Sequence, residues 1–201
     1  LRSVSRNNTR PCVALKCDIK KFFQSVDHDI LFSLLRNKIS DPDALWLLNK
    51  IIGSFSPGIP IGNLTSQLFA NVYMNVLDQF VKHTLRVPHY LRYTDDFVIV
   101  GRNRSFLKNL LKQIDVFLSE KLRLSLHPHK IIFGNYHAGI DFLGYVQFPC
   151  HRLLRTKTRK RILRKAQKGM SEQALQSYLG VLSPANSYKI SEILKNDFWL
   201  T

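Results

Sequence analysis

Apolar residues recur along the chain with the spacing of strands in some stretches and of helices in others. The run V-A-L-K-C-D-I at 13–19 has its single acid near the end and predicts a buried strand. Helical spacing follows residues 27–29 and 41–42, so these Asp-rich positions are expected to cap two helices. Residues 54–62 hold two prolines and two glycines and predict a loop, after which helical periodicity resumes over 64–80.

Two of the predicted helices have an apolar stripe that we expect to face the core. In the helix that begins near Pro42, the stripe consists of Leu45, Trp46, Leu48 and Ile52. In the helix over residues 64–80, it consists of Leu64, Leu68, Val72, Val76 and Phe80.

The stretch Y-L-R-Y-T-D-D-F-V-I-V at 90–100 is rich in β-branched and aromatic residues on both sides of its two acids. It predicts two strands joined by a tight turn, with Asp95 and Asp96 at the tip. The remaining elements expected are a helix near 105–121, short strands near 122–126, 130–133 and 140–148, and helices from 151 onward.

This order of elements predicts an α+β fold, in which a mostly antiparallel sheet has helices packed on one face. In a split β-α-β arrangement the first strand lies beside the central hairpin. Asp18, at the end of the first strand, is then expected next to Asp95 and Asp96. A turn that contains two Asp residues is also a common solvated feature, so the hairpin alone leaves both interpretations open.

The charge of the chain favours one class of partner. The 201 residues include 30 Lys and Arg against 14 Asp and Glu, a net charge of +16. Such an excess indicates a polyanion, either nucleic acid or an anionic membrane surface. No run approaches the ~18 apolar residues of a membrane-spanning helix, so nucleic acid is favoured and no membrane is expected. Three scattered cysteines without disulfide or zinc-site spacing favour the cytoplasm: Cys12, Cys17 and Cys150.

Nine of the basic residues lie between 152 and 168, a stretch without any acid. This change of composition predicts a boundary near 149, between a first domain over 1–148 and a second over 149–201. Nine like charges would repel one another, which favours phosphate binding; the alternative is a solvated helix face.

Three carboxylates at one sheet edge would repel one another and raise their own pKa values unless cations held them. Carboxylates together with phosphate oxygens suit Mg²⁺. Two such ions about 3.5–4 Å apart stabilise the attacking and leaving oxygens of a displacement at phosphorus. The basic surface is then interpreted as the part that binds nucleic acid, and the three carboxylates as the part that binds catalytic metal ions.

Five stretches of the chain carry a family pattern. They are C-D-I-K-K-F-F-Q-S-V-D-H (17–28), G-I-P-I-G-N-L-T-S-Q-L-F-A-N-V-Y (58–73), Y-T-D-D (93–96), L-S-L-H-P-H-K (124–130) and I-D-F-L-G-Y (140–145). In this order they resemble consecutive motifs of the bacterial reverse transcriptase family. The chain is most similar to the reverse transcriptases of diversity-generating retroelements, in which a hydrophobic residue, here Ile61, replaces the glutamine of the usual P-Q-G.

The resemblance implies a polymerase palm followed by the start of a helical, basic thumb. It implies an error-prone RNA-directed DNA polymerase, which transfers a nucleotide from a dNTP to a primer 3′-hydroxyl by two-metal chemistry. The implied cofactors are two Mg²⁺ ions, for which Mn²⁺ can substitute. The implied partners are template RNA, a DNA primer and a small basic accessory protein, and the implied setting is the cytoplasm, with a bacterial or phage gene.

The resemblance also assigns roles to individual residues. The metal site would consist of Asp18, Ile19, Asp95 and Asp96, with the three aspartates as the catalytic residues. Phe23 would exclude a ribose 2′-hydroxyl, and Lys130 would lie near the leaving pyrophosphate. The nucleotide-binding set is Lys21, Phe22, Phe23, Ile61, Gly62 and Lys130. The primer- and template-binding set is Gln67, Tyr93, Phe142, Leu143, Gly144, Tyr145, Arg155, Lys157, Arg159, Lys160 and Arg164.

Family members carry a fingers region of several dozen residues before the first aspartate, whereas 17 residues precede Asp18 here. Residues 1–12 are therefore interpreted as the tail of that region, and activity of the isolated chain is expected to depend on the missing part. Three alternatives remain open. They are a group II intron, retron or phage-defence reverse transcriptase; a catalytically incompetent nucleic-acid-binding fragment; and an RNA-dependent RNA polymerase, against which the ring of Phe23 argues.

Overall fold

The computed structural model describes residues 10–199, which form two compact units. Of the described residues, the first unit comprises residues 12–133, and the second comprises residues 134–199 together with residues 10–11. The boundary predicted near 149 lies inside the second unit. The fingers remnant predicted over 1–12 lies almost wholly outside the described residues.

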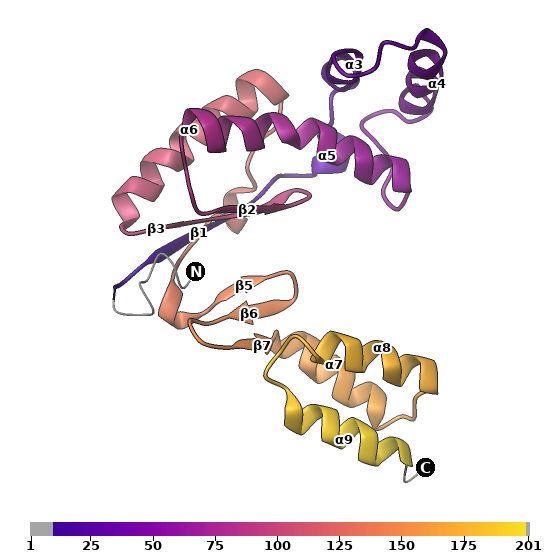
Figure 1. The fold of residues 1–201 in the computed structure, drawn as a ribbon, viewed down its shortest axis with the longest axis vertical. Helices are drawn as coiled ribbons and strands as arrows, with labels where there is room; N and C mark the ends of the chain where they lie inside the picture. The colour runs from indigo at the N-terminus through magenta and orange to yellow at the C-terminus, as the bar shows by residue number, and fades with distance from the viewer. Residues whose placement is uncertain (1–9, 200–201) are drawn as a thin grey trace. The chain divides into compact units, whose positions relative to one another are not determined.

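The first unit is built on a four-stranded sheet in the order β2-β3-β1-β4, of which β1, β2 and β3 are labelled in Figure 1. The strands are β1 (Val13–Asp18), β2 (Tyr90–Tyr93), β3 (Asp96–Gly101) and β4 (Ile132–Asn135). β1 and β3 are antiparallel, and β2 and β3 form the predicted hairpin. The first strand therefore lies beside the hairpin, as the split β-α-β arrangement predicts.

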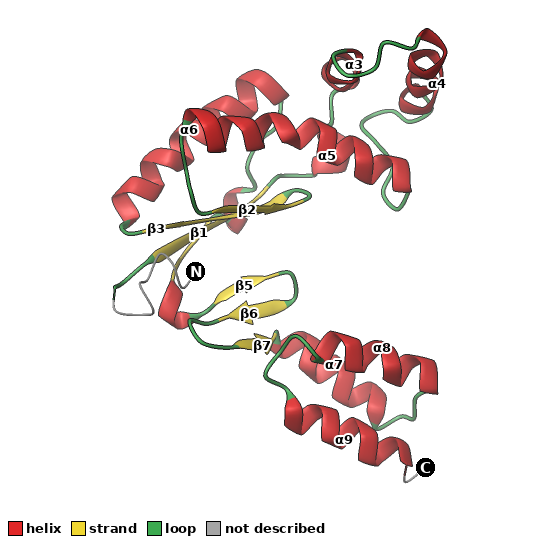
Figure 2. Ribbon diagram, viewed as in Figure 1, coloured by secondary structure: helices red, strands yellow, loops and turns green. Residues whose placement is uncertain are grey.

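Two long helices, α5 (Leu64–Gln79) and α6 (Arg104–Leu122), cover one face of this sheet (Figure 2). Three further helices connect β1 to α5: α2 (Phe22–Ser25), α3 (His28–Arg36) and α4 (Pro42–Gly53). Alternate strand residues such as Leu15, Cys17 and Ile99 are buried in the core with these helices. Because side chains alternate along a strand, Lys16 and Asp18 lie on the opposite face. The predicted α+β fold is confirmed.

The apolar stripe predicted over residues 64–80 is wrong at its start, where Leu64 and Leu68 are 82% and 60% exposed, whereas Val72, Val76 and Phe80 are partly buried against the core. The buried face is rotated from it and consists of Ser66, Phe69, Ala70, Tyr73, Met74 and Leu77. Tyr73 can lie fully inside because its hydroxyl donates to the Leu122 carbonyl at 2.7 Å. The prediction relied on apolar residues at every fourth position, and it therefore missed a buried face that is made partly of Ser, Ala and Tyr. Trp46 of α4 is likewise 61% exposed rather than packed in the core.

Both predicted helix caps are confirmed. Asp27 Oδ1 accepts a hydrogen bond from the Ile30 amide at 3.0 Å, and Asp41 Oδ1 accepts one from the Asp43 amide at 2.9 Å. The strand predicted near 122–126 is wrong, because α6 runs to residue 122 and this segment forms an isolated bridge, between Leu126 and Ile19, in place of a strand. Lys130 ends a short 3-10 turn, Pro128–Lys130, instead of lying on a strand.

The second unit contains a three-stranded antiparallel sheet of β5 (Ile140–Phe142), β6 (Tyr145–Gln147) and β7 (Arg152–Leu154). Three helices follow: α7 (Thr156–Ala166), α8 (Glu172–Leu182) and α9 (Tyr188–Trp199). β7 was predicted as part of a helix. The small core of this unit is formed by Leu154, Ile162, Leu175, Leu182 and Leu194. No helix in the described part of the chain has the length and apolar character needed to cross a membrane.

Candidate active site

The carboxylates of Asp18 and Asp96 lie next to each other because the β1–β3 register places the two residues directly opposite. Asp96 is the first residue of β3, so the hairpin tip consists of residues 94–95 and not of the two acids. Lys130 Nζ lies 2.8 Å from Asp18 Oδ2, and Lys16 Nζ lies 3.9 Å from Asp96 Oδ2. Like charges directly opposed in a sheet are destabilising, and the two lysines offset part of that repulsion.

Burial raises the pKa of Asp96, and although Lys16 lowers it, the carboxylates of Asp18 and Asp95 raise it further. Its Oδ1 atom is buried and accepts no hydrogen bond from any described residue. A buried carboxylate oxygen without a donor is costly. Among the three aspartates, the Asp96 carboxylate is therefore the one that a bound cation would stabilise most.

The cluster fits a divalent cation by the chemistry of its donors, because hard cations prefer carboxylate oxygens. In this structure Asp18 accepts from Lys130, and the Asp95 carboxylate accepts a hydrogen bond from Thr94 Oγ1 at 2.9 Å. Within the described residues no three Asp, Glu, His or Cys side chains are already arranged to hold a metal ion. The suitable carboxylates are thus gathered at one place, and Lys130 acts as their internal counter-ion.

Arg92 ties the turn that carries Asp95 to the end of α5. Its guanidinium donates to both carboxylate oxygens of Asp78, through Nε at 2.8 Å and Nη2 at 2.6 Å, and through Nη1 to the Thr94 carbonyl at 2.9 Å. Tyr90 donates a further hydrogen bond to Asp78 Oδ1 at 2.7 Å. A bidentate arginine–carboxylate pair has a fixed geometry. The backbone just before Asp95 is therefore held in place.

The residues predicted to bind the nucleotide differ in accessibility. Phe22 is buried in the core at 2% exposure, with its ring edge-on to that of Phe23 at 5.3 Å between centroids. Phe23 itself is half-buried, and Lys21 is exposed. Ile61 is 76% exposed, and the neighbouring Gly62 has a φ of 101°. The side chains of Phe23 and Ile61 are therefore accessible from solvent, whereas Phe22 packs against Phe23 from the core side.

Three other predicted residues of the first unit are accounted for as follows. Ile19 is buried at 1% exposure and has an apolar side chain, so only its backbone carbonyl could coordinate a metal ion. Gln67 is exposed on α5, and Tyr93 is 59% exposed at the end of β2.

The second unit contains the predicted primer-contacting hairpin. Phe142 and Tyr145 pair across a turn formed by Leu143 and Gly144, whose φ angles are 54° and 84°. Positive φ at both central positions is typical of a tight two-residue hairpin turn. The Tyr145 hydroxyl donates to the Val181 carbonyl at 2.9 Å. Tyr145 is thus engaged within its own unit, whereas Leu143 at the tip is 45% exposed.

The predicted phosphate contacts fall into two groups. Arg155, just before α7, donates through Nε to Asp141 Oδ1 at 2.9 Å and is therefore paired. The other four predicted side chains lie along α7, are exposed, and pair with no carboxylate of the described residues: Lys157, Arg159, Lys160 and Arg164.

Sequence reasoning missed several residues that shape the site. The place of Lys16 in the site could have been predicted from the sequence, because it lies two residues before Asp18 on a strand and therefore on the same face. The sequence gives no indication of the ion pair between Arg92 and Asp78, because this pair joins a strand to a helix and depends on the tertiary structure.

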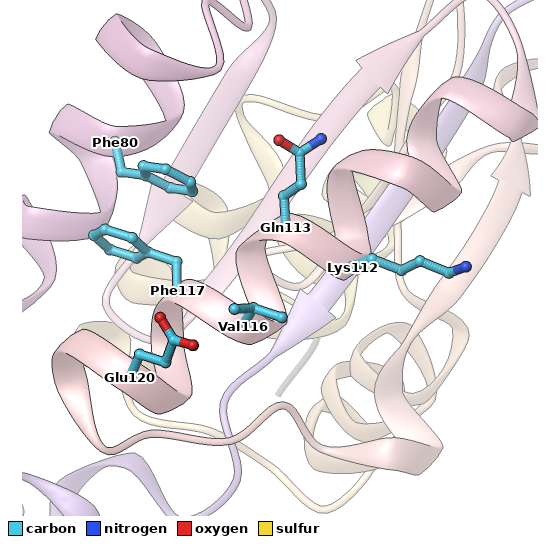
Figure 3. A pocket seen from close by; sticks show the side chains of 6 residues that line it. All are labelled: Phe80, Lys112, Gln113, Val116, Phe117 and Glu120. Atoms are coloured by element: carbon cyan, nitrogen blue, oxygen red, sulfur yellow. The ribbon is translucent and has the colours of Figure 1, made fainter.

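A separate surface hollow of about 380 Å³ lies beside α6 (Figure 3). The rings of Phe80 and Phe117 stack there with their centroids 3.9 Å apart. The lining is completed by Lys112, Gln113, Val116 and Glu120. None of the predicted site residues lines this hollow, so it is distinct from the carboxylate cluster.

The sequence matches the reverse transcriptase (RNA-dependent DNA polymerase) family over residues 1–147, and the chain belongs to that family. It is 25% identical over 193 residues to protein YkfC of Escherichia coli (strain K12), covering 75% of this chain and 49% of that protein. It is 22% identical over 200 residues to the group II intron-encoded protein LtrA of Lactococcus lactis subsp. cremoris, covering 64% and 33%.

A solved structure shares the fold: telomerase from Candida tropicalis in complex with the TWJ fragment of telomeric RNA. It has a TM-score of 0.59 at 14% identity and covers 98% of this chain and 39% of that chain. The present chain spans at most about half the length of these relatives. The predicted membership of the reverse transcriptase family is confirmed.

Proposed function

We propose that this chain is the palm and the start of the thumb of an RNA-directed DNA polymerase. The observation that carries the proposal is the register that places Asp18 opposite Asp96, beside the turn with Asp95, in a chain of the reverse transcriptase family. The proposed reaction is attack of a primer 3′-hydroxyl on the α-phosphate of a dNTP, with release of pyrophosphate.

The proposed role of the aspartates is to hold two divalent ions, Mg²⁺ first and Mn²⁺ as a substitute. Such ions, when bound, stabilise the attacking and leaving oxygens of the displacement. The Arg92 contacts fix the backbone before Asp95, so that carboxylate needs little reorganisation to meet a ligand. Lys130, whose ammonium already lies at the Asp18 carboxylate, is the cationic donor proposed for the leaving pyrophosphate.

The proposed substrates are a dNTP and a DNA primer on an RNA template. The half-buried ring of Phe23 is proposed to contact the sugar and to exclude a ribose 2′-hydroxyl. The cations exposed along α7 are proposed to follow the phosphates of the duplex, because free Lys and Arg side chains bind phosphate with release of counterions.

For the setting, we propose a diversity-generating retroelement of a bacterium or phage, with cytoplasmic location and a small basic accessory protein. The supporting feature is Ile61, which offers a nucleotide only apolar contact. Apolar packing discriminates weakly between partners, whereas unmade polar contacts reject them strongly. A group II intron, retron or phage-defence enzyme is the alternative setting.

Primer extension tests the activity. The chain and an N-terminally extended version are each given matched RNA and DNA templates, Mg²⁺, and either dNTPs or NTPs. We expect extension on RNA with dNTPs. Binding to template–primer without extension by either version would favour the second candidate, a nucleic-acid-binding fragment without catalysis, which the exposed cations of α7 also support.

Sequencing of the complementary DNA tests the setting. Ile61→Gln should lower the error rate, because a glutamine amide can hydrogen-bond to the sugar or to neighbouring backbone. Equal error spectra in the two proteins would remove Ile61 from the fidelity argument and with it the support for the retroelement.

A further inference from the structure

The loop that carries Ile61 is attached at its base to the segment that carries Phe23. The Ile59 amide donates to the Phe23 carbonyl at 2.7 Å. One residue earlier, the Gly58 carbonyl lies 2.6 Å from His28 Nε2. Ile59 is buried at 4% exposure, whereas Ile61 is exposed. The base of the loop is therefore fixed, and its outer part projects from it.

Gly58 permits this close approach. A Cβ atom at Gly58 would overlap the Phe23 carbonyl oxygen and lie 2.7 Å from Gln24 Cα. Its φ of 75° is also in the region that favours glycine. No other residue type can hold the loop this near to Phe23 without displacing backbone.

His28 is the side chain that completes the attachment. A carbonyl oxygen only accepts hydrogen bonds, so Nε2 of His28 carries the proton and donates to Gly58. His28 is the first residue of α3, whose cap Asp27 accepts from the Ile30 amide and pairs with Arg123 Nη1 at 2.6 Å. The imidazole is therefore held by a helix that is itself anchored to the end of α6.

We propose that His28 and Gly58 are positioning residues for nucleotide selection. They fix the distance between the ring of Phe23 and the side chain of Ile61, so that the two act as one wall of the nucleotide pocket. The inference rests on the proposed function. Neither His28 nor Gly58 needs to touch the nucleotide; their role is to prevent the loop from moving away and leaving room for a 2′-hydroxyl.

The test compares His28→Leu, which removes the donor, with His28→Gln, whose amide can still donate to Gly58. Both are measured for the ratio of dNTP to NTP incorporation, because a ratio does not depend on how much protein is folded. We expect His28→Leu to lower the ratio by roughly tenfold, the lower end of what one pocket contact contributes, and His28→Gln to remain near the parent. Phe23→Ala gives the upper limit of the loss.

Asn103→Ala is the matched control for stability, because it removes the cap bond that the Phe106 amide donates to Asn103 Oδ1, just beyond the far end of β3. It should leave the ratio unchanged. An unchanged ratio in His28→Leu, or an equal fall in His28→Leu and His28→Gln, would overturn the inference.

Hydrogen exchange at the Ile59 amide separates the inference from the proposed function, because it requires no turnover. We expect about tenfold faster exchange in His28→Leu than in His28→Gln, as the base of the loop opens locally. Equal exchange would overturn the attachment itself. A chain that shows this difference but extends no primer would contradict the proposed function, and the role in selection with it.

Discussion

Charged side chains in the first unit form ion pairs around the site, whereas those of α7 in the second unit face solvent. Asp18 pairs with Lys130 and Asp78 pairs with Arg92. Along α7, none of the six Lys and Arg side chains has a carboxylate partner among the described residues. Charges that take part in chemistry must be fixed before the substrate arrives. Charges that bind a polyanion must instead be free to exchange counterions for phosphates.

The largest effect expected is on catalysis by the first unit. Asp18→Asn or Asp95→Asn should lower primer extension by about 10²–10³-fold or more, as the loss of one strong electrostatic stabiliser does. The affinity for template–primer should stay nearly unchanged, because the cations of α7 remain. Extension at a rate near that of the parent in either variant would contradict the metal-holding role.

The opposite pattern is expected from the second unit. Changing Lys157, Arg159, Lys160 and Arg164 to Gln should make the slope of log K against log[salt] shallower by about 3–4 units, because each phosphate contact contributes roughly 0.9. The rate at saturating template–primer should not change. A matched control neutralises four exposed cations around α6, Arg102, Lys108, Lys112 and Lys121, and should leave the slope closer to that of the parent. Equal slopes in both variants would contradict the inference that the cations of α7, and not those around α6, bind the phosphates.

Stability should also separate the units. Tyr73→Phe removes a buried hydroxyl that donates to the Leu122 carbonyl at 2.7 Å and accepts from the Asp27 amide at 3.3 Å. The loss leaves buried polar groups unsatisfied and should lower the free energy of unfolding by about 1–3 kcal/mol. Neutralising the cations of α7 should change it by less than about 0.5 kcal/mol. Urea unfolding measures both, and a Tyr73→Phe variant as stable as the parent would contradict the role of this hydroxyl.

The smallest effect concerns the carboxylate pair itself. Asp96→Asn should stabilise the protein by roughly 0.2–1 kcal/mol at neutral pH without divalent ions, because it removes a like charge opposite Asp18. The pKa of Asp96 is raised in the folded protein, so protonation of Asp96 removes the same repulsion in the parent. The free energy of unfolding of the parent should therefore rise as the pH falls through that pKa, and the difference from the variant should shrink. Thermal unfolding in a chelator, followed from neutral to acidic pH, checks both signs. A variant less stable than the parent at neutral pH would show that Lys16 outweighs the repulsion.

The sequence was sufficient for the parts of the fold that depend on local pattern. A short apolar run predicted β1, and β-branched and aromatic residues around two acids predicted the hairpin. The order of elements along the chain predicted that Asp18 would lie beside the hairpin acids. Asp27 was correctly predicted as a cap because capping joins residues three positions apart.

Features that depend on long-range packing were not predictable. The ion pair of Lys130 with Asp18 joins residues 112 positions apart, and the bond from His28 to Gly58 involves a backbone carbonyl, which has no sequence signal. The buried face of α5 was missed because Tyr73 is inside only when Leu122 provides an acceptor. Likewise, β7 lies in a stretch whose basic composition gave no strand pattern.

Thr94 has a φ of 52° in the turn just before Asp95. For a β-branched residue this backbone conformation is strained, and such strain costs on the order of 1–3 kcal/mol. The hydrogen bond from Arg92 to the Thr94 carbonyl holds the turn in this conformation. Glycine at position 94 would relieve this strain, but it would lose the hydrogen bond that Thr94 Oγ1 donates to the Asp95 carboxylate. Replacing Arg92, in contrast, would allow the turn to relax and take Asp95 with it.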